Sequence, residues 1–293
     1  MSRAAAWVQA ARPRTLSAAA APVLIGAGLA KAHGTFVLLP VLAAFAGAIL
    51  IQIGTNLAND YYDFVRGGDT PDRVGPVRVT QAGLIPARQV WWGMVAALAA
   101  AALVGVYLVF VGGWPIVWIG LASLVCAVAY TGGPYPLAYH GLGDPFVFVF
   151  FGLIAVGGTY WVQALALPAD VLLAGAGIGA LTTAILVANN LRDLETDKSA
   201  GKRTLVVRFG RKASRVQYAL LMAVGFGVPI VGVGLYGWPA AALVVLVSAA
   251  AAVSPLTLIM TRDDPRDLIP ALGGTARVVG LYGVLLAAGL AFG

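Results

Sequence analysis

The chain consists of long apolar runs separated by short polar segments. Nine of these runs have the length and composition of membrane-spanning helices. We predict spans at Thr15–Ala32, Phe36–Ala58, Val90–Val111, Trp114–Tyr130, Pro145–Leu165, Val171–Ala188, Val216–Tyr236, Pro239–Met260 and Ile269–Phe292. Several apolar cores are shorter than the ~20 residues that a span needs, so their helices should extend into the headgroup region. The predicted fold class is an all-α membrane protein.

The composition supports a membrane protein. Of the 293 residues, 60% are hydrophobic and 11% are charged, whereas soluble domains carry about 25% charged residues. A net charge of +7 is compatible with nucleic-acid binding. In so apolar a chain, however, basic loops on the inner side of a membrane explain it better. Two His and one Cys, Cys126, leave neither a zinc site of the usual type nor an intrachain disulfide.

The distribution of basic residues predicts the orientation. With the N-terminus inside, eighteen of the 19 Lys and Arg residues fall in inner segments, and only Lys31 falls outside. Nine spans then put the C-terminus outside. We expect a multi-pass protein of the cell (inner) membrane with its active site on the cytoplasmic side. The first thirty residues resemble a signal peptide, but further spans follow at once, so we interpret them as the first membrane helix.

Two polar stretches, Asn56–Asp63 and Asn189–Asp197, lie where apolar runs end. Asn56 and Asp60 are four positions apart, as are Asn59 and Asp63, and the second stretch repeats this interval at Asn189, Asp193 and Asp197. Helical residues three or four apart share a face, so each stretch is expected to present a stack of oxygen ligands.

Stacked carboxylates repel one another unless a cation lies among them. Oxygen ligands without a nearby His or Cys are typical of a hard ion such as Mg²⁺, which completes its shell with water and substrate phosphate. A helix C-terminus also favours a cation. We therefore predict that Mg²⁺ is bound by Asn59, Asp63, Asn189, Asp193 and Asp197. The alternative is that an Asp at a helix end merely meets water.

A weak internal repeat accompanies these stretches. Each is followed later by an outer turn, Gly112-Gly113-Trp114-Pro115 in the first case and Gly237-Trp238-Pro239 in the second. Residues 1–293 are thus interpreted as one domain with two pseudo-repeated halves, approximately 12–140 and 141–293. Parallel halves would bring both Asp stretches to one inner mouth of the bundle, although chance similarity is the alternative.

Basic side chains near the stretches are candidates for binding a metal-bound anion such as a diphosphate. We include the amide of Asn56 and five basic residues in this set, namely Arg14, Arg66, Arg78, Lys198 and Lys202. Most such cations are also explained by a solvated positive-inside face. Tyr130 precedes a Gly- and Pro-rich break at residues 131–136 and is a candidate cation–π lining for a carbocation.

A cavity within the membrane suits a lipid tail, and a Mg²⁺ site at the opening of that cavity suits a diphosphate head group. Together they indicate a polyprenyl diphosphate as substrate. Mg²⁺ and basic side chains would stabilise the departing pyrophosphate, and a nucleophile would capture the allylic carbocation. Asp60 and Asp144 are the candidates for a general base.

At this point the residues support a resemblance. The stretch Asn56–Asp69, the run Arg73-Val-Gly-Pro-Val-Arg78-Val-Thr-Gln81-Ala-Gly83, the pair Tyr130-Thr-Gly-Gly and Gly141-Leu-Gly-Asp144, and Asn189–Gly201 resemble the UbiA superfamily of intramembrane aromatic prenyltransferases. Arg12-Pro-Arg14-Thr-Leu and Thr275-Ala-Arg277-Val-Val fit the same pattern. The likeness spans nearly the whole chain and is closest to the branch that acts on 1,4-dihydroxy-2-naphthoate in menaquinone synthesis.

The resemblance implies nine helices around a central cavity open sideways to lipid, and Mg²⁺ at Asn59, Asp63, Asp193 and Asp197. It implies transfer of a polyprenyl group from its diphosphate to C2 of dihydroxynaphthoate with loss of CO₂, which gives demethylmenaquinol. Many members carry Tyr-Pro-x-x-Lys after the fourth helix, but here Tyr135-Pro136-Leu-Ala-Tyr139 lacks the Lys. This departure argues against an ordinary 4-hydroxybenzoate enzyme.

Two alternatives belong to another functional class, and a third differs only in its acceptor. A CDP-alcohol phosphotransferase also uses intramembrane Asp and Mg²⁺, but its Asp-Gly frame is absent because Phe64 follows Asp63. A secondary transporter would suit parallel halves, but its charges should lie near mid-membrane rather than at one mouth. A prenyltransferase for another aromatic acceptor, such as homogentisate or 4-hydroxybenzoate, remains open.

Overall fold

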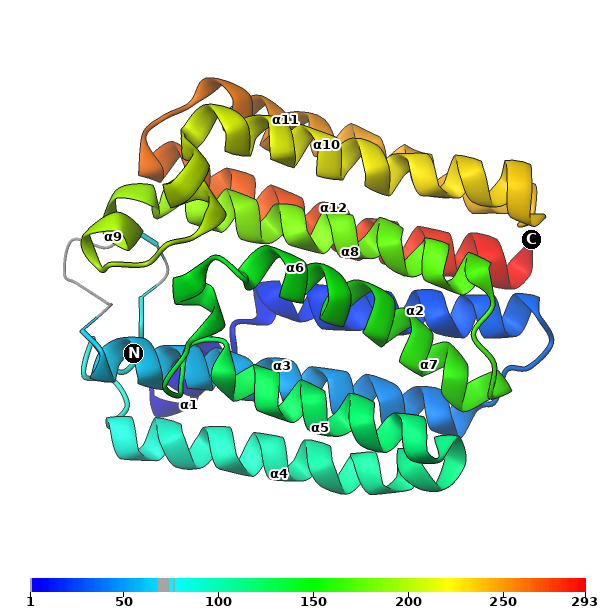
Figure 1. Ribbon diagram of the computed structural model, residues 1–293, viewed down its shortest axis with the longest axis horizontal. Helices are drawn as coiled ribbons and strands as arrows, with labels where there is room; N and C mark the ends of the chain where they lie inside the picture. The colour runs from blue at the N-terminus through cyan, green and yellow to red at the C-terminus, as the bar shows by residue number, and fades with distance from the viewer. Residues whose placement is uncertain (1, 68–73, 76) are drawn as a thin grey trace.

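The apolar runs form long helices that lie side by side (Figure 1). The computed structural model describes residues 2–67, 74–75 and 77–293. Within this part of the chain, eight helical segments are long and apolar enough to cross a membrane: Arg3–Ala32, Leu38–Val65, Ala87–Gly112, Gly143–Ala164, Ala169–Arg192, Leu205–Tyr236, Ala240–Thr261 and Pro265–Phe292. A further apolar helix, Trp114–Ala129, has 16 residues. The all-helical class is confirmed, and each predicted span overlaps one of these segments.

Several segments are composite. The individual elements are α1 (Arg3–Ala11), η1 (Pro13–Thr15), α2 (Leu16–Ala32), α3 (Leu38–Val65), α4 (Ala87–Gly112), α5 (Trp114–Ala129), η2 (Leu137–His140), α6 (Gly143–Phe148), η3 (Val149–Ile154), α7 (Ala155–Ala164), α8 (Ala169–Arg192), α9 (Leu194–Ser199), α10 (Leu205–Tyr236), η4 (Ala240–Ser248), α11 (Ala249–Thr261) and α12 (Pro265–Phe292). Of the η elements, η3 is a π-helical turn and the others are 3-10 helices.

Local sequence accounts for many helix ends. Thr204 and Asp264 accept hydrogen bonds from the first-turn amides of α10 and α12, as N-cap residues do. Gly237 ends α10 in the left-handed conformation, which glycine adopts without steric cost. Proline residues sit at the starts of α5 and α12, where the missing N–H leaves no helical hydrogen bond unmade.

The polar stretches gather at one end of the bundle, which we call the motif end. The α3 C-terminus, α9 and the chain N-terminus lie there, and the C-terminus lies at the opposite end (Figure 1). Termini at opposite ends agree with an odd number of crossings.

Buried apolar side chains form two clusters. The larger joins α2 to α7, α8, α10, η4, α11 and α12 around residues such as Ile25, Ile178 and Tyr282. The smaller joins α1, α3 and α4 around Leu57, Val90 and the loop residue Ile85. Because α2 packs with the later helices, the packing groups do not follow the predicted halves 12–140 and 141–293. The repeat therefore stays a prediction.

Candidate active site

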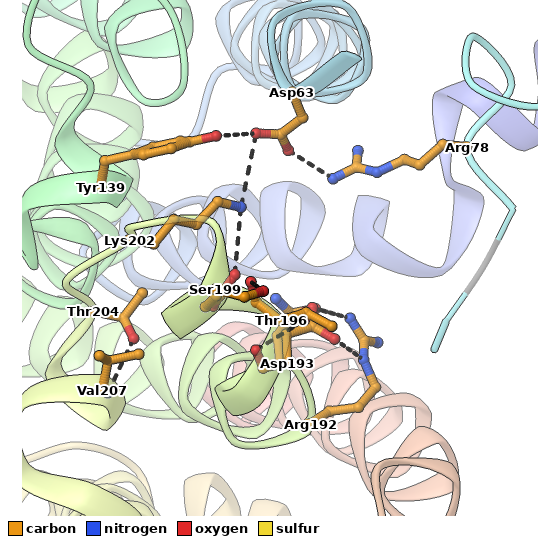
Figure 2. A network of polar contacts seen from close by, with 12 residues as sticks. Asp63, Arg78, Tyr139, Arg192, Asp193, Thr196, Ser199, Lys202, Thr204 and Val207 are labelled. Atoms are coloured by element: carbon orange, nitrogen blue, oxygen red, sulfur yellow. Dashed lines mark hydrogen bonds and ion pairs between the residues drawn. The ribbon is translucent and has the colours of Figure 1, made fainter. Parts of the chain in front are cut away.

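The first polar stretch lies within the last three turns of α3 rather than beyond its end. Asp63 is 2% exposed and is surrounded by donors (Figure 2). Its Oδ2 accepts a hydrogen bond from Arg78 Nη2 at 2.9 Å. Its Oδ1 accepts one from the Tyr139 hydroxyl at 3.2 Å and lies 3.7 Å from Lys202 Nζ. Asp63 is therefore a buried carboxylate held by cations.

Asp60 points to a different environment. Its Oδ1 accepts a hydrogen bond from the Thr80 amide at 3.0 Å, and its Oδ2 accepts one from the Val79 amide at 3.2 Å. A carboxylate that receives two backbone N–H groups anchors the loop that supplies them. In this structure Asp60 fastens the chain near Arg78 to α3.

Asn56 also anchors the chain. Its Nδ2 donates to the Ala11 carbonyl at 2.9 Å and lies 3.0 Å from Thr15 Oγ1. Gln52, one turn earlier on α3, lies 3.3 Å from the same hydroxyl. Gln52 was not among the residues predicted from the sequence, although its place four residues before Asn56 in an apolar helix was a usable signal.

The second polar stretch does not form one regular helix. It was expected to project Asn189, Asp193 and Asp197 from a single helix, but α8 ends at Arg192 and Asp197 belongs to the separate helix α9. Asp193, at the junction, has φ −93° and ψ 11°. Its amide still bonds to the Asn189 carbonyl, and its carbonyl accepts from the Asp197 amide. The break turns the last carboxylate relative to the first two ligands.

Arg192 ties the second stretch together. It is 2% exposed, and its Nε and Nη2 donate to the two carboxylate oxygens of Asp193 at 2.7 and 2.6 Å. Its Nη2 also donates to Asn189 Oδ1 at 2.8 Å. Gly75 packs on the guanidinium, since a Cβ there would lie 3.3 Å from Arg192 Cζ. The arginine thus neutralises Asp193 and orients Asn189.

Lys202 joins the two stretches. Its Nζ lies 3.7 Å from Asp63 Oδ1 and 3.4 Å from Asp197 Oδ1, and Figure 2 shows it extended between α3 and the α9 region. One cation therefore touches a carboxylate from each stretch. The structure brings the two stretches to the same mouth, as the sequence predicted.

The pKa values at this junction reflect burial and charge. Burial, followed by the charges of Asp193 and Asp63, raises the pKa of Asp197 to about 6, although Lys202 opposes the rise. For Lys202, burial lowers the pKa, but the carboxylates of Asp63 and Asp197 outweigh it, so its pKa is raised. Lys202 therefore stays cationic.

The donor set fits Mg²⁺ that is completed by substrate. No three His, Cys, Asp or Glu side chains among the described residues lie close enough to hold an ion by themselves. The oxygens come instead as separate carboxylate and amide groups, each carboxylate already beside an ammonium or guanidinium. Mg²⁺ is usually held in this way, by one or two carboxylates plus water and phosphate.

An apolar cavity of about 560 Å³ lies next to the motifs. Its walls are mostly Ala, Val, Ile, Leu and Phe side chains of α2 to α7, including Phe146 and Phe150. Its polar lining includes Gln52, Asn56 and Asn59. Asn59 Oδ1 accepts a hydrogen bond from Thr131 Oγ1 at 2.9 Å. The cavity suits a hydrocarbon tail whose polar end reaches α3 near Asp63.

Tyr130 and Asp144 lie at the motif end as well. Tyr130 lines the cavity, and its hydroxyl would lie 3.1 Å from a Cβ placed on Gly143. Asp144 is 5% exposed and accepts a hydrogen bond from Gln217 Nε2 at 2.8 Å. Gln217 could not be predicted from the sequence, because its pairing with Asp144 of α6 depends on how α10 packs.

Three predicted anion-binding residues lie elsewhere. Arg14 in η1 and Lys198 in α9 are exposed, and no described contact joins either to the motif carboxylates. Arg66 donates to the Gly133 carbonyl, and its guanidinium carbon lies 5.7 Å from the centre of the Tyr139 ring. Arg73, which the resemblance also uses, lies outside the described residues.

Comparison with known proteins decides the family. The model of the UbiA prenyltransferase family matches residues 19–290. The chain belongs to this family. It is 40% identical over 293 residues to the 1,4-dihydroxy-2-naphthoate octaprenyltransferase of Mycobacterium tuberculosis, covering 100% of this chain and 99% of the relative. The enzyme of the same name from Escherichia coli is 36% identical over 304 residues, covering 99% and 96%.

The fold likeness extends to a solved structure. A UbiA homolog from Archaeoglobus fulgidus bound to DMAPP and Mg²⁺ aligns with a TM-score of 0.65 at 15% identity, covering 96% of this chain and 98% of the homolog. The resemblance to the UbiA prenyltransferases seen in the sequence is thereby confirmed, and the protein is a prenyltransferase.

Proposed function

We propose that the protein transfers a polyprenyl group from polyprenyl diphosphate to 1,4-dihydroxy-2-naphthoate, with loss of CO₂ and pyrophosphate, in menaquinone biosynthesis. The relatives from M. tuberculosis and E. coli, which this chain matches over nearly its full length, carry the corresponding name. The observation that carries the proposal is the Lys202 bridge between Asp63 and Asp197 beside the apolar cavity. Charged side chains that suit a diphosphate head group thus lie next to a cavity that suits a prenyl tail.

Mg²⁺ would be held by the oxygens of the two stretches, namely Asn59, Asp63, Asn189, Asp193 and Asp197. When bound, it would stabilise the negative charge that develops on the leaving diphosphate. Arg78 and Lys202 border the same carboxylates and are the cations that we assign to the diphosphate. Asn56 borders the polar end of the cavity. We do not assign Arg14, Arg66 or Lys198 to the diphosphate. Arg14 and Lys198 are exposed, and Arg66 donates to the Gly133 carbonyl.

The acceptor chemistry needs no ring deprotonation. When the allylic C–O bond breaks, its electron pair leaves with pyrophosphate, and the carbocation then bonds to C2 of the ring. The C2–carboxylate bond breaks next, its electron pair restores aromaticity, and CO₂ departs. Loss of CO₂ takes the place of loss of a proton, so Asp60 and Asp144 can keep the structural contacts described above. The ring of Tyr130 lines the cavity, where a π face stabilises a cation.

The decisive experiment identifies the product. Purified protein is incubated with Mg²⁺, a prenyl diphosphate and a panel of dihydroxynaphthoate, homogentisate and 4-hydroxybenzoate, and products are identified by mass. We expect the decarboxylated prenyl naphthalenediol as the main product. Preferential prenylation of another acid would show that this acid, and not dihydroxynaphthoate, is the acceptor. If no prenylated product formed, the proposal would be overturned.

We further propose nine membrane crossings, with the motif end and the N-terminus in the cytoplasm. Support comes from the basic residues, all but Lys31 of which belong to segments assigned to the inner side. In a Cys126→Ser background, Ser2→Cys and Ser199→Cys should react with a membrane-impermeant maleimide only after cells are permeabilised. Lys31→Cys should react in intact cells. Labelling of the two Ser positions from opposite sides would contradict this topology.

The raised pKa of Asp197 predicts a pH-dependent metal requirement. Below a pKa of about 6 the carboxyl is protonated, and a metal ligand must be deprotonated. The Mg²⁺ concentration for half-maximal rate should therefore be flat above about pH 7 and rise as pH falls, approaching about tenfold per unit well below the pKa. Asp197→Asn should flatten this dependence. An unchanged Mg²⁺ requirement from pH 5 to 8 would show that Asp197 does not bind the ion.

A further inference from the structure

The apolar cavity beside the motifs, which we call the tail cavity, has a definite depth. Its polar opening is marked by Asn59 on α3 and by Tyr130 at the end of α5. Away from this opening, Ile116 is the first residue of α5 that lines the cavity, and Val162 is the last residue of α7 that does so. Both are buried, with exposed fractions of 6% and 4%. These two side chains close the far end of the cavity, which we call the floor.

The floor is held by contacts between three helices. Gly112, the last residue of α4, lies against it, because a Cβ there would collide with Ile116 and would lie 3.1 Å from Val162 Cγ1. The two side chains therefore meet over one point of α4. Trp161 of α7 donates a hydrogen bond from Nε1 to the Gly112 carbonyl at 2.8 Å. This bond ties α7 to α4 at the floor.

The depth of the tail cavity corresponds to a prenyl tail of moderate length. Tyr130 and Ile116 are 14 positions apart on α5, and this separation spans about 21 Å at the rise of an α-helix. An extended isoprene unit contributes four carbon–carbon bonds to the chain and advances it by about 5 Å. The distance from the opening to the floor therefore matches about four isoprene units.

The volume of the cavity leads to the same length. A methylene-sized group occupies about as much space as a water molecule in the liquid, which takes about 30 Å³. A cavity of about 560 Å³ therefore holds about twenty carbon atoms, which is about four isoprene units. Two independent measures of the cavity thus agree.

The walls are open one helical turn before the floor. Gly120 lies four positions after Ile116 in α5, and Gly158 lies four positions before Val162 in α7. A Cβ on Gly120 would meet no atom of the described residues within 4 Å, and the nearest contact of a Cβ on Gly158 would be 3.8 Å. In contrast, a Cβ on Gly152 would collide with the backbone of α8. Gly120 and Gly158 therefore leave room for an occupant of the cavity rather than for a neighbouring helix.

A tail that left the cavity sideways before Gly120 would leave the region of the floor unfilled. The lining there consists of apolar side chains such as Ala44, Val109 and Phe110. Water occupies a cavity only where polar partners are present. A hydrocarbon tail, in contrast, gains dispersion contacts with each wall that it touches. The composition of the lining therefore favours a tail that continues to the floor.

We propose that Ile116 and Val162 determine how much of the prenyl tail the protein holds, so that about four isoprene units lie between the opening and the floor. The remainder of a longer tail turns away at the floor. The inference rests on the prenyl diphosphate of the proposed function, but it does not depend on the identity of the aromatic acceptor. Both residues determine tail specificity and take no part in bond cleavage.

The test compares prenyl tails of two to five isoprene units. Calorimetry measures the Kd of unreactive S-prenyl thiolodiphosphates for detergent-purified protein with Mg²⁺. The Kd of each variant is divided by that of wild type at the same tail length, which cancels the partitioning of the ligand into detergent. Gly120→Leu places a side chain in the path of the tail. Its Kd ratio should be about tenfold larger for four units than for two, the scale of losing the burial of two methylene groups.

A second substitution separates this effect from a folding defect. The Cα–Cβ bond of a helical residue tilts toward the helix N-terminus, so the leucine side chain introduced by Gly120→Leu leans toward Ile116. Gly120→Leu/Ile116→Ala should therefore recover most of the lost affinity for four units. Ile116→Ala alone should shift the preference toward five units over four by about threefold, the scale of one more buried methylene group.

Gly234→Leu is the matched control. Gly234 is an exposed residue of α10 outside the cavity, and a Cβ there would likewise meet no described atom within 4 Å. Its Kd ratio should be the same at every tail length. A ratio for Gly120→Leu that did not depend on tail length, or no recovery in the double variant, would overturn the inference. Intact length dependence with prenylation of a different acid would overturn only the assigned acceptor, whereas no binding of any prenyl thiolodiphosphate by wild type would overturn the proposed function itself.

Discussion

Asp63→Asn and Asp193→Asn are each expected to reduce turnover by about 10²-fold or more, the scale for losing one preorganised electrostatic contact in an active site. Each substitution removes one negative charge from the proposed metal ligands and keeps the size of the side chain. Turnover is measured with saturating Mg²⁺ and both substrates on detergent-purified protein. Near-wild-type turnover of either variant would remove that residue from the metal site.

Both variants should lose stability, because Asp63 is paired with Arg78 and Lys202 and Asp193 is paired with Arg192. From the sequence, neutralising a carboxylate near a helix C-terminus would relieve an unfavourable dipole interaction. The structure changes this expectation, because Asp193 pairs with Arg192, whose side chain is 1% exposed. Breaking a buried ion pair costs about 3–5 kcal/mol. Asp193→Asn should therefore lower the melting temperature, and Asp193→Asn/Arg192→Gln should regain part of it without regaining activity.

The double variant Asp63→Asn/Asp193→Asn tests whether the motifs form one site. Residues that act as a unit are strongly non-additive. Lys202 already connects Asp63 to Asp197 across the mouth, so the double variant should be little slower than the slower single variant. Strictly multiplicative losses, in protein of comparable melting behaviour, would show two independent sites.

Removal of divalent metal should abolish turnover. In excess EDTA the leaving diphosphate loses the divalent ion that offsets most of its charge, and Lys202 and Arg78, whose own charge Asp63 partly offsets, do not replace that ion. We expect activity to fall below detection and to return when Mg²⁺ is added in excess of the chelator. Full turnover in EDTA would contradict the metal-dependent mechanism.

The metal-free protein should nevertheless stay folded. Its buried carboxylates have partners within the chain, Arg78 and Lys202 for Asp63 and Arg192 for Asp193. EDTA alone should change the melting temperature by less than about 2 °C, whereas Mg²⁺ together with a prenyl diphosphate should raise it through ligand binding. Melting curves in the four combinations of metal and diphosphate provide the control for the activity loss.

The sequence by itself determined the helical class and the approximate positions of the spans. An apolar run long enough to span a bilayer must form a helix there, because lipid satisfies no backbone hydrogen bond. The sequence also identified the two polar stretches that contain Asp63 and Asp193. Acidic side chains that recur every four positions repel one another, so in a chain this apolar they need a cationic partner. Local composition carries this information, so no tertiary contact was needed.

The tertiary structure decided what each polar side chain does. The helix break at Asp193 depends on how the loops fold back onto the helices, and so do the hydrogen bonds that Asp60 accepts from the Val79 and Thr80 amides. The Lys202 bridge and the pairing of Asp144 with Gln217 join residues far apart in the chain. Arg66, Arg78 and Lys202 are alike in sequence as cations that follow the motifs. Packing brings Arg78 and Lys202 to Asp63 and Arg66 to the Gly133 carbonyl and the Tyr139 ring. An ion pair depends on distances that residue spacing does not fix once the helix has ended.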